Sequence, residues 1–505
     1  MTSILSGFIP AYWSIVFVRL QFLLLLVVMT MGCHHFSGNT VSGDVPSAAD
    51  VQKIALIDSG SALFDSLRNG SLVYQFYHNN HFVPVWWEQN IPSARADSML
   101  QLISNIREYG LLPQHYHSLE LQKLLYDSAV ADEYVIRKSD MLLTDAFIAI
   151  CKDLKYGRRA FTEMDSDSVI RYVDSVALVN LTRTIRQNEI RSVLEEQEPK
   201  YGQYQMLKQQ LRKILRNDSL DAKAYLNGLV TDTTDLGAQI VSLEINMDRW
   251  RKESAISGRH ILVNIPGGYL ELTENDSVSF KSRVIVGTAK NQTPVLDGLI
   301  RSFIIYPYWN VPRSIAVNEI LPQAKRDSLY LRNHHYEVLS PAGEVLHPDS
   351  INWMALHKNN FPYTIRQKEG LHNALGLIKF WFDNPYAVFL HDTNARLLFD
   401  RKKRALSHGC VRVEKAMELG RYLVRGNDIV SPEDLDQYLE FEKQMTIRIT
   451  EPIPVHLRYL TCAWRDGAVE FYDDVYGADK EVFDRMYGED PVIREDVQLA
   501  QGVRP

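Results

Sequence analysis

The spacing of apolar residues changes near Gly258, and this change constrains the fold more than any other feature of the chain. Upstream, apolar side chains recur at helical spacing, as in the stripe over residues 143–154. Downstream they alternate with polar residues, and residues 261–273 contain two such runs separated by a Pro-Gly-Gly turn, which is the pattern of a β-hairpin. We therefore expect an α+β multidomain protein in which a helical part precedes a β-rich part.

The same patterns predict the domain boundaries. Residues 51–251 are expected to form a helical domain, in which the charge-rich stretch 195–216 is a solvated helix. Residues 252–440 are expected to form the β-rich domain. A polar segment with many Pro and His residues, at about 321–366, interrupts the alternation and is predicted to be an insertion. Residues 441–505 hold one more alternating hairpin and are expected to form a C-terminal β extension.

Composition and charge exclude several classes of protein. The chain has 505 residues, of which 46% are hydrophobic, so it can fill large cores and is neither disordered nor collagen-like. The 55 basic and 62 acidic residues give a net charge of −7, and we therefore expect no nucleic-acid partner. Four cysteines are too few for a disulfide scaffold. Cys151 lies on an apolar helical stripe and Cys462 in an alternating run, so both are predicted to pack in a core.

The N-terminus has the features of an export signal. The apolar run Leu20–Met31 follows Arg19 and is too short for a typical membrane span, so residues 1–33 are predicted to be a signal peptide, with a retained anchor helix as the alternative. Residues 34–50, rich in Ser, Gly and Asn, are predicted to be a tether. Cys33 is either lipidated as in bacterial lipoproteins or discarded by cleavage nearby. In each case the body of the protein is expected outside the cytoplasm.

Cys410 and His391 are the strongest candidates for catalytic residues. Cys410 lies in a polar, glycine-containing turn, which differs from the apolar setting of an inert core thiol. A thiolate is the nucleophile of acyl transfer and needs a base or a positive charge nearby. His391, at the end of a predicted strand, can take the thiol proton and return it to a leaving amine. The pair predicts nucleophilic acyl transfer through a cysteine.

The residues directly before Cys410 are predicted to shape the oxyanion site. Gly409 has no side chain, so backbone N–H groups near His408, Gly409 and Cys410 can face a developing oxyanion. Ser407 belongs to the same turn. For His408 two roles stay open, because its side chain either braces the turn or takes part in the reaction directly.

Arg412 and Asp392 are predicted to contact the substrate, Arg412 by holding a carboxylate. The alternative prediction for Arg412 is a structural role, as the partner of an acidic group such as Asp392 or Glu414. A zinc site is not expected, because this region has only one thiolate, at Cys410, and none of the closely spaced ligand pairs of known zinc sites. No cofactor is expected.

The pattern of His391 followed by residues 392–406 and then by Ser-His-Gly-Cys resembles the signature of the L,D-transpeptidase (YkuD-type) catalytic domain family. The resemblance extends to the large Gram-negative branch that carries a helical scaffold domain. The segments that carry it are 246–251, 261–266, 283–287, 308–312 with 314–315, 373–376 and 378–379.

The resemblance implies a β-sandwich-like catalytic domain, a helical scaffold domain and a lid at about 321–366. It further implies that Cys410 attacks the third residue of a peptidoglycan stem tetrapeptide and expels D-alanine, with His391 as base. The amine of a neighbouring stem then resolves the thioester into a 3→3 crosslink. Family members are typically acylated by carbapenems. For this chain we expect a location in the periplasm.

The chain departs from the usual pattern of this branch at two places, and two other functions are compatible with its sequence. The branch usually carries a peptidoglycan-binding module, for which residues 217–236 are too short and too polar. Tyr306 precedes Pro307 where the branch commonly has Asn. The alternatives are a catalytically silent scaffold that binds the cell wall and a thiol L,D-carboxypeptidase that removes D-alanine without crosslinking.

Overall fold

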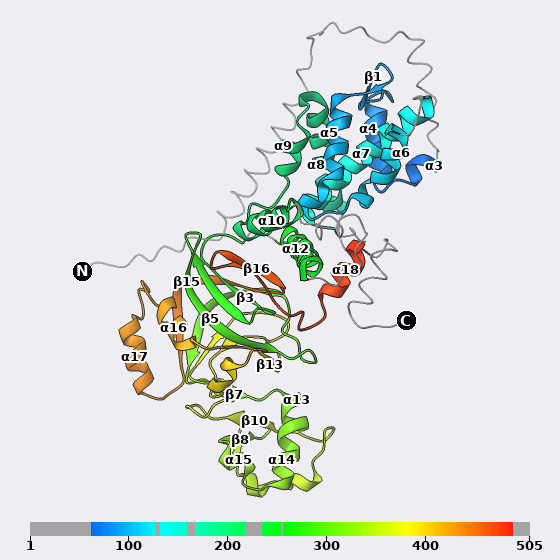
Figure 1. The fold of residues 1–505 in the computed structure, drawn as a ribbon. Coiled ribbons are helices and arrows are strands. Elements are labelled where there is room, and N and C mark those ends of the chain that lie inside the picture. Colours follow the sequence, from blue (N-terminus) through cyan, green and yellow to red (C-terminus); the bar gives the residue numbers. More distant parts are fainter. Residues whose placement is uncertain (1–61, 127–131, 159–166, 218–234, 254–255, 488–505) are drawn as a thin grey trace, which may run out of the picture. The chain divides into compact units, whose positions relative to one another are not determined.

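The computed structural model describes residues 62–126, 132–158, 167–217, 235–253 and 256–487. The predicted signal and tether lie outside these residues, as do residues 218–234, which cover most of the segment considered for a peptidoglycan-binding module. Figure 1 shows the predicted change of structure, because helices dominate the blue-to-green half of the chain and strands follow in green to orange.

The chain divides into two compact units. Of the described residues, one unit holds Tyr77–Val83, in which the Phe82 N–H donates to the Tyr77 carbonyl at 2.8 Å and closes a turn. The other unit holds all remaining described residues.

The N-terminal half is helical, with one short hairpin. Its elements are α3 (Ala62–Asp65), α4 (Gly70–Asn79), β1 (Trp87–Glu88), β2 (Ile91–Pro92), α5 (Ala94–Ser104), η1 (Ile106–Tyr109), η2 (Pro113–Tyr116), α6 (Ser118–Tyr126), α7 (Glu133–Tyr156), α8 (Asp167–Gln187), α9 (Ile190–Glu195), α10 (Gly202–Leu215) and α12 (Asp235–Arg251). Helix α7, the longest among the described residues, begins at an Asp132 cap and buries Cys151, which confirms the packing role predicted for this thiol. Within the described ranges, no helix combines the length and the apolarity needed to cross a membrane.

The predicted solvated helix over residues 195–216 is wrong. In α10, Tyr204, Leu207 and Leu211 are fully buried and pack against α12 together with Cys462. The polar residues between these positions made the whole segment read as solvated, although the buried positions form one apolar face that packs against a neighbouring helix. The burial of Cys462 in this cluster confirms its predicted packing role.

The C-terminal half is built on a nine-stranded sheet that closes on itself. The strands are β3 (His260–Asn264), β4 (Tyr269–Glu274), β5 (Ser277–Gly287), β6 (Leu296–Ile305), β11 (Ile378–Trp381), β12 (Leu390–His391), β13 (Ala405–Ser407), β14 (Val411–Val413) and β15 (Met445–Arg458). Their order is β13-β5-β14-β12-β11-β6-β15-β3-β4, and β4 pairs with β5 again. The long strand β5 closes the circuit because its first half pairs with β4 and its second half with β14.

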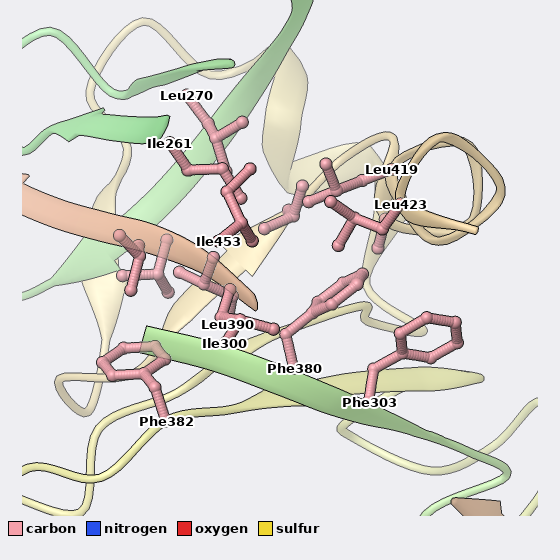
Figure 2. Packing of buried hydrophobic residues seen from close by; sticks show 14 of the residues in the cluster. Ile261, Leu270, Ile300, Phe303, Phe380, Phe382, Leu390, Leu419, Leu423 and Ile453 are labelled. Atoms are coloured by element: carbon pink, nitrogen blue, oxygen red, sulfur yellow. The ribbon is translucent and has the colours of Figure 1, made fainter. Parts of the chain in front are cut away.

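The core of this domain lies between the strands and helix α16 (Ala416–Leu423), which α17 (Pro432–Glu440) follows. Figure 2 shows Phe303 and Phe380 of the sheet in one cluster with Leu419 and Leu423 of α16. These side chains are at most 3% exposed, so the inner sides of the strands are committed to packing. Functional groups must therefore come from the outer sides and the strand ends.

The predicted boundary of the C-terminal extension, at residue 441, is wrong. Strand β15 pairs antiparallel with β6 and parallel with β3, so it is a central strand of the closed sheet. Its alternating apolar residues belong to the main core, which is why it cannot form a separate unit. The extension proper starts after Arg458 and consists of the hairpin β16 (Cys462–Arg465) and β17 (Ala468–Phe471) with helix α18 (Asp479–Tyr487).

An inserted subdomain, residues 309–367, has a sheet and a core of its own. Its elements are β7 (Trp309–Asn310), α13 (Arg313–Ile315), the π-helical η3 (Ala316–Ile320), α14 (Leu321–Arg326), α15 (Tyr330–Asn333), β8 (Tyr336–Leu339), β9 (Val345–Leu346), η4 (Pro348–Ser350), η5 (Trp353–Ala355) and β10 (Thr364–Gln367). The sheet order is β7-β10-β8-β9, and the core runs from Val311 to Ile365. The insertion thus begins before the predicted residue 321, because β7 pairs with β10.

Candidate active site

The nucleophile candidate Cys410 lies in a tight turn between β13 and β14. Both strands pair with β5, β13 in parallel and β14 antiparallel, so the turn lies where β5 ends at Gly287. Gly409 has a φ of +116°, a conformation that side chains disfavour and that requires glycine. Cys410 is partly buried, and its Sγ lies 4.0 Å from the Ala387 carbonyl oxygen.

Ser407 braces this turn. Its hydroxyl donates to the Cys410 carbonyl at 2.6 Å and accepts from the Gly409 N–H at 3.1 Å. The Gly409 N–H is therefore engaged within the turn, which corrects the prediction that it faces an oxyanion. The N–H groups of His408 and Cys410 make no hydrogen bond to the described residues, so these two are the candidate oxyanion donors.

Thr293 anchors the turn from outside and was not predicted from the sequence. Its hydroxyl donates to the Gly409 carbonyl at 2.7 Å and accepts from the Gly287 N–H at 2.9 Å. Tyr476 supports the same place, because its hydroxyl donates to the Gly287 carbonyl at 2.7 Å and accepts from the Thr293 N–H at 3.1 Å. No sequence signal marks either residue, since both lie far from the Cys410 turn along the chain.

His391 is held in the neutral form that a general base requires. It is 5% exposed at the end of β12, and its ring Nδ1 lies 2.5 Å from the Asp392 carbonyl oxygen. A carbonyl only accepts, so Nδ1 carries the hydrogen and Nε2 has the free lone pair. Burial lowers the pKa of His391 to about 3, and the charges of Arg412 and Lys379 act in the same direction. The imidazole is therefore neutral at pH 7.

The strand pairing places the candidate base His391 and the candidate nucleophile Cys410 beside each other on neighbouring strands. Strands β12 and β14 are parallel neighbours, with Leu390 opposite Val411 and His391 opposite Arg412. Cys410, which immediately precedes β14, consequently lies beside the strand that ends at His391. No hydrogen bond joins the two side chains within the described structure, a common situation before substrate is bound.

Asp392 supports His391 instead of facing substrate, which corrects its predicted role. Its carboxylate accepts from the Leu377 N–H at 3.0 Å and from Arg396 at 2.9 Å. A Cβ at Gly376 would lie 2.3 Å from the same carboxylate, so the fit is tight. With both oxygens engaged by protein groups, the carboxylate fixes the segment whose carbonyl orients the imidazole.

Arg412 pairs with neither acidic neighbour proposed for it, so that alternative is wrong. Asp392 binds Arg396, and Glu414 binds Arg283. The Arg412 side chain is partly buried and makes no hydrogen bond or ion pair with the described residues. Burial lowers its pKa, and the charge of Cys410 opposes that shift. An unpaired, partly desolvated guanidinium is available for a carboxylate ligand.

His408 contacts the inserted subdomain. Its Nε2 lies 2.8 Å from a carboxylate oxygen of Glu319 in η3, and both side chains are about half exposed. The side chain therefore does not brace the turn, a role that Ser407 fills. Glu319 was not predicted from the sequence, because only the folded insertion brings it near the Cys410 turn. Within the described ranges, no group of three or more His, Cys, Asp or Glu residues is arranged to hold a metal.

Two family models match the chain. Residues 71–211 match the scaffold domain, and residues 258–431 match the L,D-transpeptidase catalytic domain, YkuD, which contains both His391 and Cys410. A Haemophilus influenzae protein named "Putative L,D-transpeptidase" is 37% identical over 222 residues, covering 44% of this chain and 45% of the relative. The chain thus matches less than half of that relative's length.

A solved structure, titled as the Ldtfm–avibactam carbamoyl enzyme, is similar with 11% identity and a TM-score of 0.20, covering 41% of this chain and 51% of the other. At that score the similarity carries no weight in the argument. The family models and the curated relative show two domains in this chain: a helical scaffold domain at residues 71–211 and, after it, a β-rich L,D-transpeptidase catalytic domain of the YkuD kind at residues 258–431.

Proposed function

We propose that this protein forms 3→3 crosslinks between peptidoglycan stem peptides through an acyl-enzyme on Cys410. The observation that carries the proposal is the state of His391. The Nδ1–H bond to the Asp392 carbonyl leaves Nε2 as a proton acceptor, on the strand next to the one that Cys410 precedes. This arrangement suits proton transfer between a thiol and a peptide amine.

The proposed reaction has two balanced steps. In the first, Cys410 Sγ attacks the carbonyl of the third residue of a donor tetrapeptide while His391 Nε2 takes the thiol proton. The carbon–nitrogen bond then breaks, and the D-alanine amine leaves with that proton. In the second step an acceptor amine attacks the thioester and gives a proton to Nε2. The carbon–sulfur bond breaks, and the proton returns to Cys410.

Arg412 is proposed to hold a carboxylate of the donor stem. The guanidinium has no partner among the described side chains, and Arg binds carboxylates with two parallel hydrogen bonds. Such a contact fixes the peptide beside Cys410 and so raises the effective concentration of the reacting groups. An Arg412→Lys variant keeps the charge but loses this geometry, and we expect it to raise KM for the tetrapeptide.

Export to the periplasm is also part of the proposal, with residues 34–50 as a tether to the membrane. It is supported by the apolar run before Cys33 and by the location of peptidoglycan. Labelling of cells with a radioactive fatty acid tests the lipid on Cys33. We expect label on the wild-type chain and none on Cys33→Ser, and an unlabelled wild-type chain favours ordinary cleavage.

The decisive experiment uses the full chain and purified disaccharide-tetrapeptide, with mass spectrometry of the products. We expect dimers that have lost one D-alanine, and none with Cys410→Ala. Intact-mass measurement after exposure to a carbapenem provides a second readout, with an adduct expected only when Cys410 is present. Loss of D-alanine without dimers would instead indicate an L,D-carboxypeptidase, and absence of both products and adduct would indicate a silent scaffold.

A further inference from the structure

Three charged or titratable side chains form a row across the catalytic sheet. Lys379 in β11 is directly opposite His391 in β12, which is directly opposite Arg412 in β14. Residues that are paired in register on neighbouring strands point to the same face of a sheet. Lys379, His391 and Arg412 therefore share one face.

The opposite face of the same strands is the core. Phe380, Leu390 and Val411, the neighbours of the row along each strand, are fully buried in the main cluster. This alternation confirms that the row faces away from the core.

Aromatic rings hold the Lys379 ammonium in this row. Its Nζ lies 3.9 Å from the centroid of the Phe389 ring and 4.9 Å from that of Trp381. Phe389 also contacts the His391 ring, with centroids 5.4 Å apart. A cation over an aromatic face is attracted by the ring quadrupole without being neutralised, so the full charge is retained.

The Lys379 charge has no anionic partner among the described residues. Its partly buried side chain makes neither a hydrogen bond nor an ion pair with them. Burial lowers the pKa of Lys379, and the charge of Cys410 opposes that shift. A desolvated cation without a counter-ion is costly. The ammonium lies over the ring of Phe389, and the Phe389 carbonyl accepts from the N–H of Val411, the residue after Cys410, at 3.1 Å, so the cation lies on the strand beside the thiol. Burial raises the pKa of the Cys410 thiol, and the Phe389 backbone and the charges of Lys379 and Arg412 oppose that rise.

The remaining groups around Cys410 cannot play the same part. His391 is buried between two cations, so the imidazole is neutral at rest and the resting site holds no imidazolium to balance a thiolate. His408, in the turn itself, points to Glu319. Arg412 is the other cation of the row, and its planar fork suits a carboxylate better than a single sulfur atom.

We propose that Lys379 supplies the positive charge that stabilises the Cys410 thiolate, while His391, neutral before the reaction, accepts the thiol proton and passes it on. The inference rests on the proposed role of Cys410 as nucleophile. In the reaction the S–H bond breaks, its proton passes to His391 Nε2 and from there to the leaving amine, and the negative charge on Sγ is balanced by the ammonium that lies over the rings of Phe389 and Trp381. The protein then uses two cations for two tasks, with Arg412 left for the substrate.

The test measures how fast iodoacetamide alkylates Cys410 between pH 5 and 10, followed by mass spectrometry of the peptide that contains Cys410. Only the thiolate reacts, so the profile reports the pKa of this thiol. We expect Lys379→Met to raise its midpoint by about one unit or more, which means about tenfold slower alkylation below the midpoint. Lys379→Arg should restore most of the rate. Lys402→Met, which removes an exposed lysine of the same domain, should match the wild type.

Two results would overturn the proposal. One is an unchanged alkylation profile in Lys379→Met together with a raised KM for the tetrapeptide, because Lys379 would then bind substrate. The other is a larger rise of the midpoint in His391→Gln than in Lys379→Met, because an imidazolium would then be the counter-ion. If Lys379→Met does not fold, Lys379→Gln, which keeps a polar end group, provides the same measurement. Alkylation needs no peptidoglycan, so a failure to form crosslinks would refute the proposed function and leave the role of Lys379 to be decided by the alkylation profile.

Discussion

Replacing Thr293 by Val tests whether a residue outside the sequence motif holds the nucleophile in place. The side chain is 2% exposed, and its hydroxyl joins two backbone segments, with 2.9 Å to the Gly287 N–H and 2.7 Å to the Gly409 carbonyl. Valine has almost the same shape, so the substitution removes the hydroxyl and leaves the packing intact. Both backbone groups then lose this buried partner.

The expected cost follows from those two groups. A buried donor or acceptor left without a partner costs roughly 1–3 kcal/mol, so the pair predicts a loss of about 2–6 kcal/mol in the free energy of unfolding. Activity should fall as well, because Gly409 is adjacent to Cys410 and its turn loses an anchor. A displacement of about 1 Å at a reacting group can reduce a rate about 100-fold.

The assays are chemical denaturation of the full chain and the rate of Cys410 acylation by a carbapenem, followed by intact mass. Thr293→Ser is the matched control, because it keeps the hydroxyl and removes only a methyl group. We expect Ser to retain most of the stability and acylation rate that Val loses. If Val and Ser behave alike, or if Val stays within about 0.5 kcal/mol and twofold of the wild type, the anchoring argument fails.

Three further predictions concern the surroundings of the same site. Gly376→Ala places a methyl group 2.3 Å from the Asp392 carboxylate at a φ of +59°, so we expect it to lower both the free energy of unfolding and the rate of Cys410 acylation. The control Gly426→Ala has a similar φ of +71° but open space around it, so it should cost only about 1 kcal/mol. Equal losses of stability in the two variants would contradict the clash. The pKa of His391 is lowered from 6.5 to about 3, so the stability that its neutral form contributes is complete above about pH 6.5 and is lost as the pH falls toward 3. In denaturation curves, the stability advantage of the wild type over His391→Gln should therefore shrink between pH 7 and pH 4. Glu319→Gln weakens an exposed contact with His408, so acylation at pH 7 should change less than about fivefold, and a larger loss would show that the inserted subdomain acts on the reaction itself.

Much of the local structure followed from the sequence. The change of apolar spacing near Gly258 predicted where helices give way to strands, and the burial of Cys151 and Cys462 followed from their positions in apolar runs. These features depend on residues close together in the chain, where periodicity alone decides which side is apolar. The His391 and Cys410 pair was recognised for a related reason, since both lie within one short motif.

Contacts between segments far apart in the chain could not be predicted from local periodicity. The alternation of β15 predicted a strand, but its place between β6 and β3 depends on a register that no local pattern encodes. The apolar face of α10 was likewise hidden by polar residues between its buried positions. In both cases the partner surface, contributed by a segment far away in the chain, decides the structure.

The sequence by itself determined the class of fold and the type of catalytic domain, and it singled out Cys410 and His391 as candidates for the chemistry, because these depend on periodicity and on a compact motif. Only the tertiary structure decided the state of the site. Strand register places Lys379 and Arg412 on either side of His391, and a turn at the end of β5 brings Thr293 to Gly409. Charge and hydrogen bonding act through space, and the distances that govern them are set by the fold and not by separation along the chain.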